Sequence, residues 1–241
     1  GDWVCSETLL WQNATTPVDI VAFAPAQVDK FNGVYADGSI KPITYSIATD
    51  QSTSSDNNDL LYYYAPGFKP GDKLVDEKLN IQFNHAFCMI DINVTLGTEF
   101  NKPKVLDDSP IIKVTLGGTK IAANVDVKNA TSIVTASGEA TNITTTQGTF
   151  TPAPDKNAEK NAISRFSCIA IPQTVAAGTF KVSLMTAGKL YEWTSVEPVE
   201  LKSGNRYTLE LTMGNNVVLL KDDKITASPW TEGTGGTLET D

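Results

Sequence analysis

Hydrophobic and polar residues alternate along most of this chain. In residues 207–213 every second position is apolar, from Tyr207 through Leu209 and Leu211 to Met213, and the positions between them are Thr or Glu. This period of two is typical of a β-strand that turns one face to a core and the other to water. We therefore expect these apolar side chains to be buried.

The same alternation, interrupted by Pro, Gly, Asn and Asp, predicts many short strands and almost no helix. Strands are expected at residues 18–24, 60–64, 79–85, 88–96, 111–116, 121–127, 163–171, 180–184, 190–193, 217–220 and 225–227. Short strands at this spacing are typical of antiparallel β-sandwiches rather than of a parallel sheet. The pattern predicts an all-β fold.

Three segments are assigned by their turn and loop residues. Gly117-Gly118 separates two strand-like runs and predicts a hairpin turn. Residues 137–161 are rich in Thr, Gly, Asn, Lys and Pro, and we expect a long loop or a wide, weak hairpin there. The tail 231–241 is polar and Gly-rich, and we expect it to lie beyond the last strand.

The alternation changes phase near Ala86. The apolar positions of residues 79–85 and those of residues 88–96 do not continue one another. A shift of one residue exchanges the two faces of a strand. Two explanations remain open: a β-bulge, or a long strand that passes from one sheet to another.

A polar linker lies between two strand-rich stretches. Residues 97–110 carry two prolines, Pro103 and Pro110. Domain boundaries fall in exposed polar segments of this kind. We place a boundary here and predict two mostly antiparallel β-sandwich domains, residues 1–97 and residues 98–241.

Charge and hydropathy limit the partners of the chain. The formal net charge is −9 over 241 residues, which argues against a nucleic-acid partner, because neutralising phosphates requires clustered Lys and Arg. No apolar run reaches the length of a transmembrane helix. The chain opens Gly1-Asp2-Trp3 without an initiator Met, so we expect a trimmed form whose export signal or lipid-anchor cysteine has been removed.

Side chains that usually perform chemistry are scarce. His85 is the single histidine, and it lies in phase with Leu79, Ile81 and Phe83, so we expect it to point inward in a structural role. A zinc site or a Ser–His–Asp relay would need further partners, and the sequence shows none nearby. We predict no catalytic, cofactor-binding or metal-binding residue and no enzyme activity.

Acidic clusters offer a weaker alternative. Asp50, Asp56, Asp59, Asn57 and Asn58 could supply oxygen ligands to calcium, but their spacing does not match an EF-hand loop. A solvated loop is the commoner explanation, and the same holds for the acidic pairs Asp107-Asp108 and Asp222-Asp223.

Aromatic, cysteine and glycosylation signals each have a plain explanation. The tryptophans Trp3, Trp11, Trp193 and Trp230 could form a sugar-binding platform, although core packing is the commoner fate of Trp in a strand. The chain has three cysteines, Cys5, Cys88 and Cys168, so they cannot all form disulfides within the chain. A disulfide between Cys88 and Cys168 remains an open alternative if their strands are neighbours. Sequons begin at Asn13, Asn93, Asn129 and Asn142 and arise easily by chance.

A series of short signatures appears in a fixed order along nearly the whole chain. After Trp11 come 18–25 (VDIVAFAP), 59–62 (DLLY), 79–86 (LNIQFNHA), 171–173 (IPQ), 202–207 (KSGNRY) and 225–233, which contains Trp230. In this order they resemble the fimbrillin-like proteins of Gram-negative anaerobes, which are subunits and accessory pilins of the type V pilus.

The resemblance implies two β-sandwich domains of transthyretin-like topology, export as a lipoprotein to the outer membrane, and assembly with other pilin subunits by a donated β-strand. It also implies adhesion to host or bacterial surface ligands. Two departures are visible. The family's processing site is typically an Arg, and the first Arg here is Arg165. The tail 231–241 has Leu238 as its one large apolar residue, which makes it a poor donor strand. A surface lipoprotein that binds glycan or a host ligand without polymerising is the alternative.

Overall fold

The structure, a computed structural model, is built almost entirely of β-strands. It describes residues 10–25, 35–36, 40–53, 58–75, 78–101, 104–129, 132–155, 161–231 and 235–239. The elements in chain order are β1 (Val18–Ala24), β2 (Ile43–Ser46), β3 (Leu61–Phe68), the short helix α1 (Pro70–Lys73), β4 (Lys78–Gln82), β5 (Asn84–His85), β6 (Cys88–Leu96), the 3-10 turn η3 (Thr98–Asn101), β7 (Ile111–Val125), β8 (Val134–Thr144), β9 (Thr146–Thr151), β10 (Ile163–Ala170), β11 (Gln173–Val175), β12 (Lys181–Thr186), β13 (Leu190–Thr194), β14 (Val199–Leu201), β15 (Asn205–Met213), β16 (Val218–Leu220), the 3-10 turn η4 (Lys221–Asp223), β17 (Thr226–Pro229) and β18 (Gly235–Glu239).

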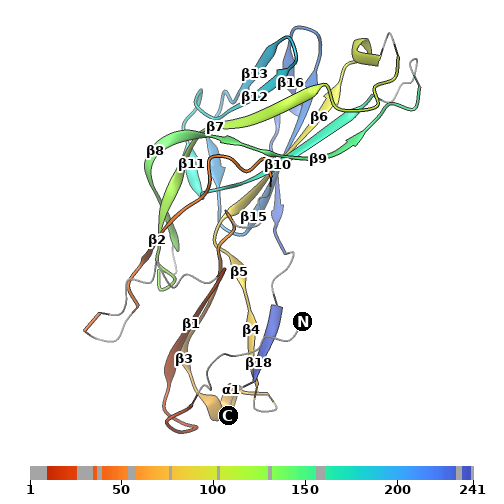
Figure 1. Cartoon of the computed structure of the whole chain (residues 1–241). Coiled ribbons are helices and arrows are strands. Elements are labelled where there is room, and N and C mark those ends of the chain that lie inside the picture. The colour runs from red at the N-terminus through yellow and green to blue at the C-terminus, as the bar shows by residue number, and fades with distance from the viewer. Residues whose placement is uncertain are drawn as a thin grey trace.

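Two large sheets form what we call the main body, in the upper part of Figure 1. One has the order β16-β15-β6-β10-β9, with β17 also on β15, and the other has the order β13-β12-β7-β2, with β8 also on β7. Among the strand pairs that the structure describes, β6 and β15 run parallel and the others run antiparallel. The predicted all-β, mostly antiparallel fold is confirmed at this level.

The alternating sequence pattern builds the core of the main body. Buried and half-buried residues alternate without a break along β6, and in β15 Leu209 and Leu211 are 0% and 1% exposed. The inward residues of both large sheets belong to one continuous core. Burying each such side chain contributes about 1.5–3 kcal/mol. The predicted burial of Tyr207, Leu209, Leu211 and Met213 is confirmed.

A smaller group of elements, which we call the small unit, lies below the main body in Figure 1 and consists of β1, β3, β5, β4, β18 and α1. Its sheets have the orders β1-β3-β5 and β18-β4. Among the described residues, Phe68, Leu79 and Phe83 are buried apolar side chains that stand apart from the continuous core. Trp11 stacks on Phe68 with ring centres 5.8 Å apart.

The phase change near Ala86 marks the passage from the small unit into the main body. The chain pairs with β18 in β4, with β3 in β5, and with β10 and β15 in β6. Of the two explanations, passage from one sheet to another is therefore confirmed. His85 lies on the last stretch before this transition.

The boundary predicted at residue 97 does not separate two cores. Strand β6 ends at Leu96, yet it lies between β10 and β15, and its buried residues share one core with Ile111 and Val114 of β7. Residues 97–110 thus connect two strands of the same core. Polar composition and prolines misled the prediction, because an exposed connection within a domain carries the same composition as a linker.

The hairpin predicted at Gly117-Gly118 is wrong. Both glycines lie inside the single strand β7, whose pairing with β8 shifts register between Leu116 and Thr119. Gly118 has a φ of +88°, and a Cβ there would come 2.1 Å from the carbonyl oxygen of Thr179. The two glycines mark a bulge and a close approach of two backbones.

Two segments differ from the expectation. Residues 134–144 and 146–151 form β8 and β9, which pair with β7 and β10, so the segment is neither a long loop nor a hairpin of its own. The tail, expected to lie beyond the last strand, contains β18. The polar residues of β8 are largely exposed or half-buried. The sequence of this strand therefore lacks the alternating apolar pattern from which a strand is predicted. Residues 156–160 lie outside the described part of the chain.

Candidate functional site

The C-terminal strand β18 lies beside a strand from the N-terminal half of the chain. Its residues pair antiparallel with β4, and Leu238 stands opposite Leu79 in the register. Figure 1 shows this pair in the small unit, where a strand late in the sequence lies beside a strand from the first half. The open edge of a strand presents backbone donors and acceptors that another strand can pair with. This two-stranded sheet is therefore a candidate place for strand exchange.

Three residues that the sequence had singled out meet where the small unit joins the main body. His85 on β5 is 6% exposed, and its Nδ1 lies 2.6 Å from Oδ2 of Asp59. The ring of Trp230 stacks on the imidazole, with ring centres 3.6 Å apart and 12° between the planes. We call Asp59, His85 and Trp230 the His85 cluster.

The His85 cluster holds the chain at the point where it leaves the main body for β18. Trp230 directly follows β17, and its backbone N–H donates to the carbonyl oxygen of Gly204 at 2.7 Å. The N–H of Gly204 donates in turn to Phe87 at 2.9 Å. A stacked ring and a backbone hydrogen bond thus fix the start of the segment that carries β18.

The inward position of His85 agrees with the sequence pattern, and its structural role stays a prediction. The side chain that faces its Nδ1 is the carboxylate of Asp59, while the ring face is covered by Trp230. In the part of the chain that the structure describes, no three His, Cys, Asp or Glu side chains gather as metal ligands would.

Among the described residues, the side chains considered for calcium have other partners and form no group of three metal-ligating residues. Asp50 accepts a hydrogen bond from the backbone of its own turn, Asn58 is buried with a main-chain hydrogen bond, and Asp59 belongs to the His85 cluster. Asp56 and Asn57 lie outside the described residues. Asp107 and Asp108 are both exposed on the surface, and Oδ2 of Asp107 lies 3.1 Å from Nζ of Lys104. Asp222 lies in the turn η4.

The three tryptophans that the structure describes pack against different partners and do not form a common platform. Trp11 packs on Phe68 of the small unit, and Trp230 stacks on His85. Trp193 meets the ring of Phe180 edge-on at 6.4 Å. Trp3 lies outside the described residues.

The cysteines of the main body act as small buried residues. Cys88 and Cys168 lie on the neighbouring strands β6 and β10, but Cys88 stands opposite Ala170 and Cys168 opposite Ile90, and both thiols are free. Burial raises the pKa of Cys168 to about 12. A thiol with so high a pKa is a poor nucleophile. Cys5 lies outside the described residues.

The four sequon asparagines lie in different settings. Asn13 is exposed and bonds the side chain of Thr16 at 2.8 Å, and Asn129 accepts a backbone hydrogen bond from Ser132 at 3.2 Å. Asn142 is exposed on β8, and Asn93 is half-buried on β6.

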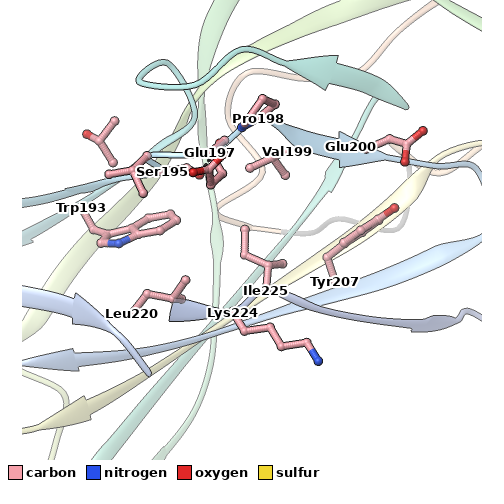
Figure 2. Close-up of a pocket in the computed structure, with 12 residues that line it drawn as sticks. Trp193, Ser195, Glu197, Pro198, Val199, Glu200, Tyr207, Leu220, Lys224 and Ile225 are labelled. Carbon is pink, nitrogen blue, oxygen red and sulfur yellow. Dashed lines mark hydrogen bonds between the residues drawn. The ribbon is translucent and has the colours of Figure 1, made fainter. Parts of the chain in front are cut away.

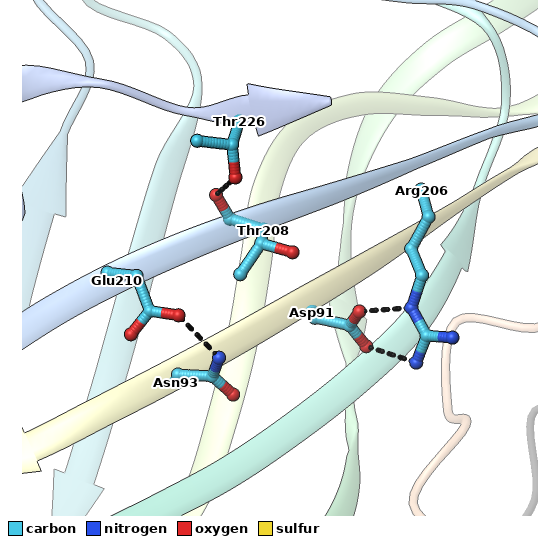
Figure 3. A network of polar contacts seen from close by, with 6 residues as sticks. All are labelled: Asp91, Asn93, Arg206, Thr208, Glu210 and Thr226. Atoms are coloured by element: carbon cyan, nitrogen blue, oxygen red, sulfur yellow. Dashed lines mark hydrogen bonds and ion pairs between the residues drawn. The ribbon is translucent and has the colours of Figure 1, made fainter. Parts of the chain in front are cut away.

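A polar network crosses the outward side of the parallel strands β6 and β15 (Figure 3). Arg206 forms an ion pair with Asp91, in which its Nη2 donates to Oδ1 at 3.3 Å. Asn93 donates from Nδ2 to Oε1 of Glu210 at 2.7 Å. Both contacts join the two strands, so one of the two arginines of the chain stabilises the centre of the sheet.

Gln51 is a buried polar residue that the sequence pattern did not predict. Gln51 is 0% exposed; its Oε1 accepts from the backbone N–H of Ile169 at 2.8 Å, and its Nε2 donates to the carbonyl oxygen of the same residue at 3.0 Å. This pair of bonds imitates the pairing of a strand along β10. Gln51 stands in a polar stretch of the sequence, which gave no signal for burial.

These features define a class of protein: an all-β molecule whose distinctive parts are strand edges and joints between sheets. A family model described as fimbrillin-like matches residues 1–230, so the chain belongs to the fimbrillin-like family. The expected resemblance is confirmed, and it places the chain among fimbrial and adhesion proteins and not among enzymes.

Three solved structures share the fold. A candidate cell adhesion protein of Bacteroides uniformis has a TM-score of 0.60 at 17% identity, over 90% of this chain and 74% of that chain. One of Bacteroides ovatus has a TM-score of 0.56 at 17% identity, over 88% and 67%. A fimbrial protein of Bacteroides vulgatus has a TM-score of 0.50 at 16% identity, over 88% and 77%. A comparison with curated proteins finds no match.

Family membership implies a place at the cell surface. Among the described residues, no helix has the length and apolar character needed to cross a membrane.

Proposed function

We propose that this chain is a structural or adhesive subunit of a cell-surface pilus that assembles by exchange of a β-strand between subunits. The observation that carries the proposal is the position of β18 on β4. A strand from the end of the chain completes a sheet begun in its first half, so a strand from another subunit could occupy the same place. Main-chain hydrogen bonds would supply the affinity and the side-chain register the specificity.

We expect the small unit to be the part of the molecule that unfolds most easily. Its buried apolar side chains outside the continuous core, within the described residues, are Phe68, Leu79 and Phe83. A two-stranded sheet is marginally stable by itself. Removing β18 from this unit therefore costs much less free energy than removing a strand from the main body.

The domain organisation and the route of export belong to the same proposal. The main body and the small unit would be the two sandwich units of transthyretin-like topology, with the division at the His85 cluster and not at residue 97. We propose export as a lipoprotein precursor, other pilin subunits as partners, and host or bacterial surface ligands for an adhesive member. The net charge of −9 argues against nucleic acid.

Peptide complementation tests the place of exchange. A chain that ends at Thr231 should bind a synthetic peptide of residues 232–241, whereas the full chain should bind it weakly because β18 already occupies the site. A peptide with Leu238→Asp is the matched control, since Leu238 stands opposite the buried Leu79. If the shortened chain keeps its fold by circular dichroism and binds neither peptide, the site is wrong.

Assembly itself is tested with processed full-length protein mixed with related pilins. Subunits joined by an exchanged strand should give ladders on detergent gels that disappear on heating, because the strand dissociates only when many bonds open together. Filaments that carry this chain should appear by electron microscopy. A protein that stays monomeric in every processed form would instead be a surface binder that does not polymerise.

A further inference from the structure

The outer edge of the six-stranded sheet is interrupted by a detour of the chain. Strand β15 pairs with β16 through Leu211–Met213 and with β17 through Asn205–Thr208. Between these stretches the chain leaves the edge through η4, where Asp222 has a left-handed φ of 55°. Asp adopts this conformation more readily than most non-glycine residues, and the conformation turns the chain away from the edge.

A pocket of about 340 Å³ opens beside this detour, between residues 220–225 and residues 193–200 (Figure 2). Its floor contains the buried residues Val199 and Tyr207. Half-buried apolar side chains form its walls, and these are Trp193, Leu220 and Ile225.

Charged side chains of both signs stand at the rim of this pocket. Glu197 and Glu200 are exposed on one side, and Lys224 is exposed on the detour. Figure 2 shows the carboxylates and the ammonium group at different parts of the opening, with the indole of Trp193 at one end. An apolar interior with a few polar groups around it is the usual composition of a small-molecule site.

The distribution of charge decides which class of ligand fits. An anion would meet the carboxylate of Glu197, and a cation would meet Lys224; the carboxylate of Glu200 is already paired with Lys202 at 3.0 Å. A neutral ligand that both donates and accepts hydrogen bonds suits the whole rim, because carboxylates accept and an ammonium group donates. Hydroxyl groups do both, and the C–H face of a sugar ring matches an aromatic wall.

The same detour disfavours an extended peptide. A peptide strand would need a continuous free edge, and residues 221–225 turn away from the edge where such a strand would continue. A compact ligand does not need this edge.

We propose that the pocket lined by Trp193, Tyr207, Glu197, Glu200 and Lys224 binds a neutral hexose unit of a glycan. The C–H face of the sugar lies on the indole of Trp193, and its hydroxyl groups bond the charged side chains at the rim. This site is independent of the strand pairing between β4 and β18.

The test measures binding of the full chain to an array of immobilised neutral glycans, followed by saturation-transfer NMR with the methyl glycosides of glucose, galactose, mannose and N-acetylglucosamine. At least one neutral saccharide should bind. Glu197→Gln and Lys224→Met should each weaken it about tenfold, the value of a hydrogen bond to a charged group.

Two variants serve as matched controls. Lys221→Met lies on the same detour but outside the pocket lining, and Glu139→Gln removes an exposed carboxylate elsewhere; both should leave binding unchanged. Trp193→Leu should abolish glycan binding. Because Trp193 also packs against Phe180, the fold of this variant must be checked, and the proposal is judged on Glu197→Gln and Lys224→Met.

Three results would overturn the proposal. The first is no neutral glycan bound anywhere on the array. The second is binding that Glu197→Gln and Lys224→Met leave intact, which places the sugar elsewhere. The third is a peptide library that binds the pocket where glycans do not.

Discussion

Gly118 shows how a single missing side chain permits a close contact between strands. Its φ of +88° favours glycine, and a Cβ would lie 2.1 Å from the backbone oxygen of Thr179. We expect Gly118→Ala to destabilise the fold by roughly 2–4 kcal/mol, from backbone strain together with the clash.

Gly188→Ala is the matched control for this prediction. Gly188 lies in a turn, and an added methyl group there would meet nothing within 4 Å, so the effect should stay within about 0.5 kcal/mol. Chemical denaturation of both variants measures the difference, and equal losses would contradict the role of Gly118.

Leu209 and Thr208 are neighbours on β15 with opposite surroundings. Leu209 is 0% exposed in the core, while Thr208 is half-buried on the outward side. Leu209→Ala should cost about 2–5 kcal/mol through the cavity it leaves, and Thr208→Ala should cost under about 1 kcal/mol. Similar unfolding midpoints for the two variants would show that the faces are misassigned.

At the scale of elements, Trp230 controls the strand that follows it. Removing its ring from His85 should release the segment that leads to β18, because the stack and one backbone bond fix its start. Trp230→Ala should speed hydrogen exchange in residues 78–82 and 235–239 and leave residues 88–96 unchanged. Trp230→Phe keeps an aromatic ring, so its hydrogen-exchange rates in these residues should lie between those of Trp230→Ala and those of the natural chain. If Trp230→Ala instead speeds exchange equally in all strands, Trp230 does not act locally on β18.

Asp19 connects the small unit to the main body in a pH-dependent way. The backbone N–H of Gly67, 3.0 Å away, lowers the pKa of Asp19 below the usual 3.8, and Lys128 of the main body, whose Nζ lies 3.4 Å from the carboxylate, lowers it further. The folded state thus favours the charged carboxylate. Its stabilisation is present above pH 3.8 and is lost as the pH falls through the lower folded value.

The effect is small because both side chains are substantially exposed to water. The free energy of unfolding of Asp19→Asn should fall short of the natural chain at neutral pH and equal it well below pH 3.8. Denaturant titrations at the two pH values measure this, and a gap that persists in acid would point to the hydrogen bonds and not to the charge.

Local sequence patterns predicted most strands, but not the bulge inside β7 or the strand β18 in the tail. An apolar run ended by Pro25 places β1, and the period of two places β15, whose apolar side is buried. Gly117-Gly118 has the composition of a turn and serves as a bulge, because only the approach of Thr179 decides between them. Strand β18 lacks an apolar pattern and exists through its pairing with β4.

At the scale of the whole molecule, long-range pairing decided what the sequence could not show. The parallel alignment of β6 with β15 joins residues on both sides of the expected boundary, and no local signal records it. The His85 cluster likewise combines Asp59, His85 and Trp230 from distant parts of the chain. The sequence pattern singled out each of these residues, but it did not predict that they contact one another.

The unequal cores predict unequal stability across the molecule. In the natural chain, backbone amides of β6 should exchange hydrogen far more slowly than those of β4 and β18. Strand β6 lies in the continuous core, whereas the small unit has only Phe68, Leu79 and Phe83 as buried apolar side chains outside that core among the described residues. Exchange monitored by mass spectrometry or NMR tests this. Equal protection in the three strands would mean that the molecule opens as one cooperative unit.

The position of β17 at the end of the main body has a mechanical consequence. β17 ends at Pro229, and the chain continues from it through Trp230. A force that is transmitted through Trp230 and directed along β17 would load this strand lengthwise. The pairs that join β17 to β15, from Asn205–Pro229 to Thr208–Thr226, would bear it together in shear instead of opening one after another. Under tension the pairing of β17 with β15 would thus persist until several hydrogen bonds break at once. The time for which it withstands the force would be set by the rate of forced unfolding.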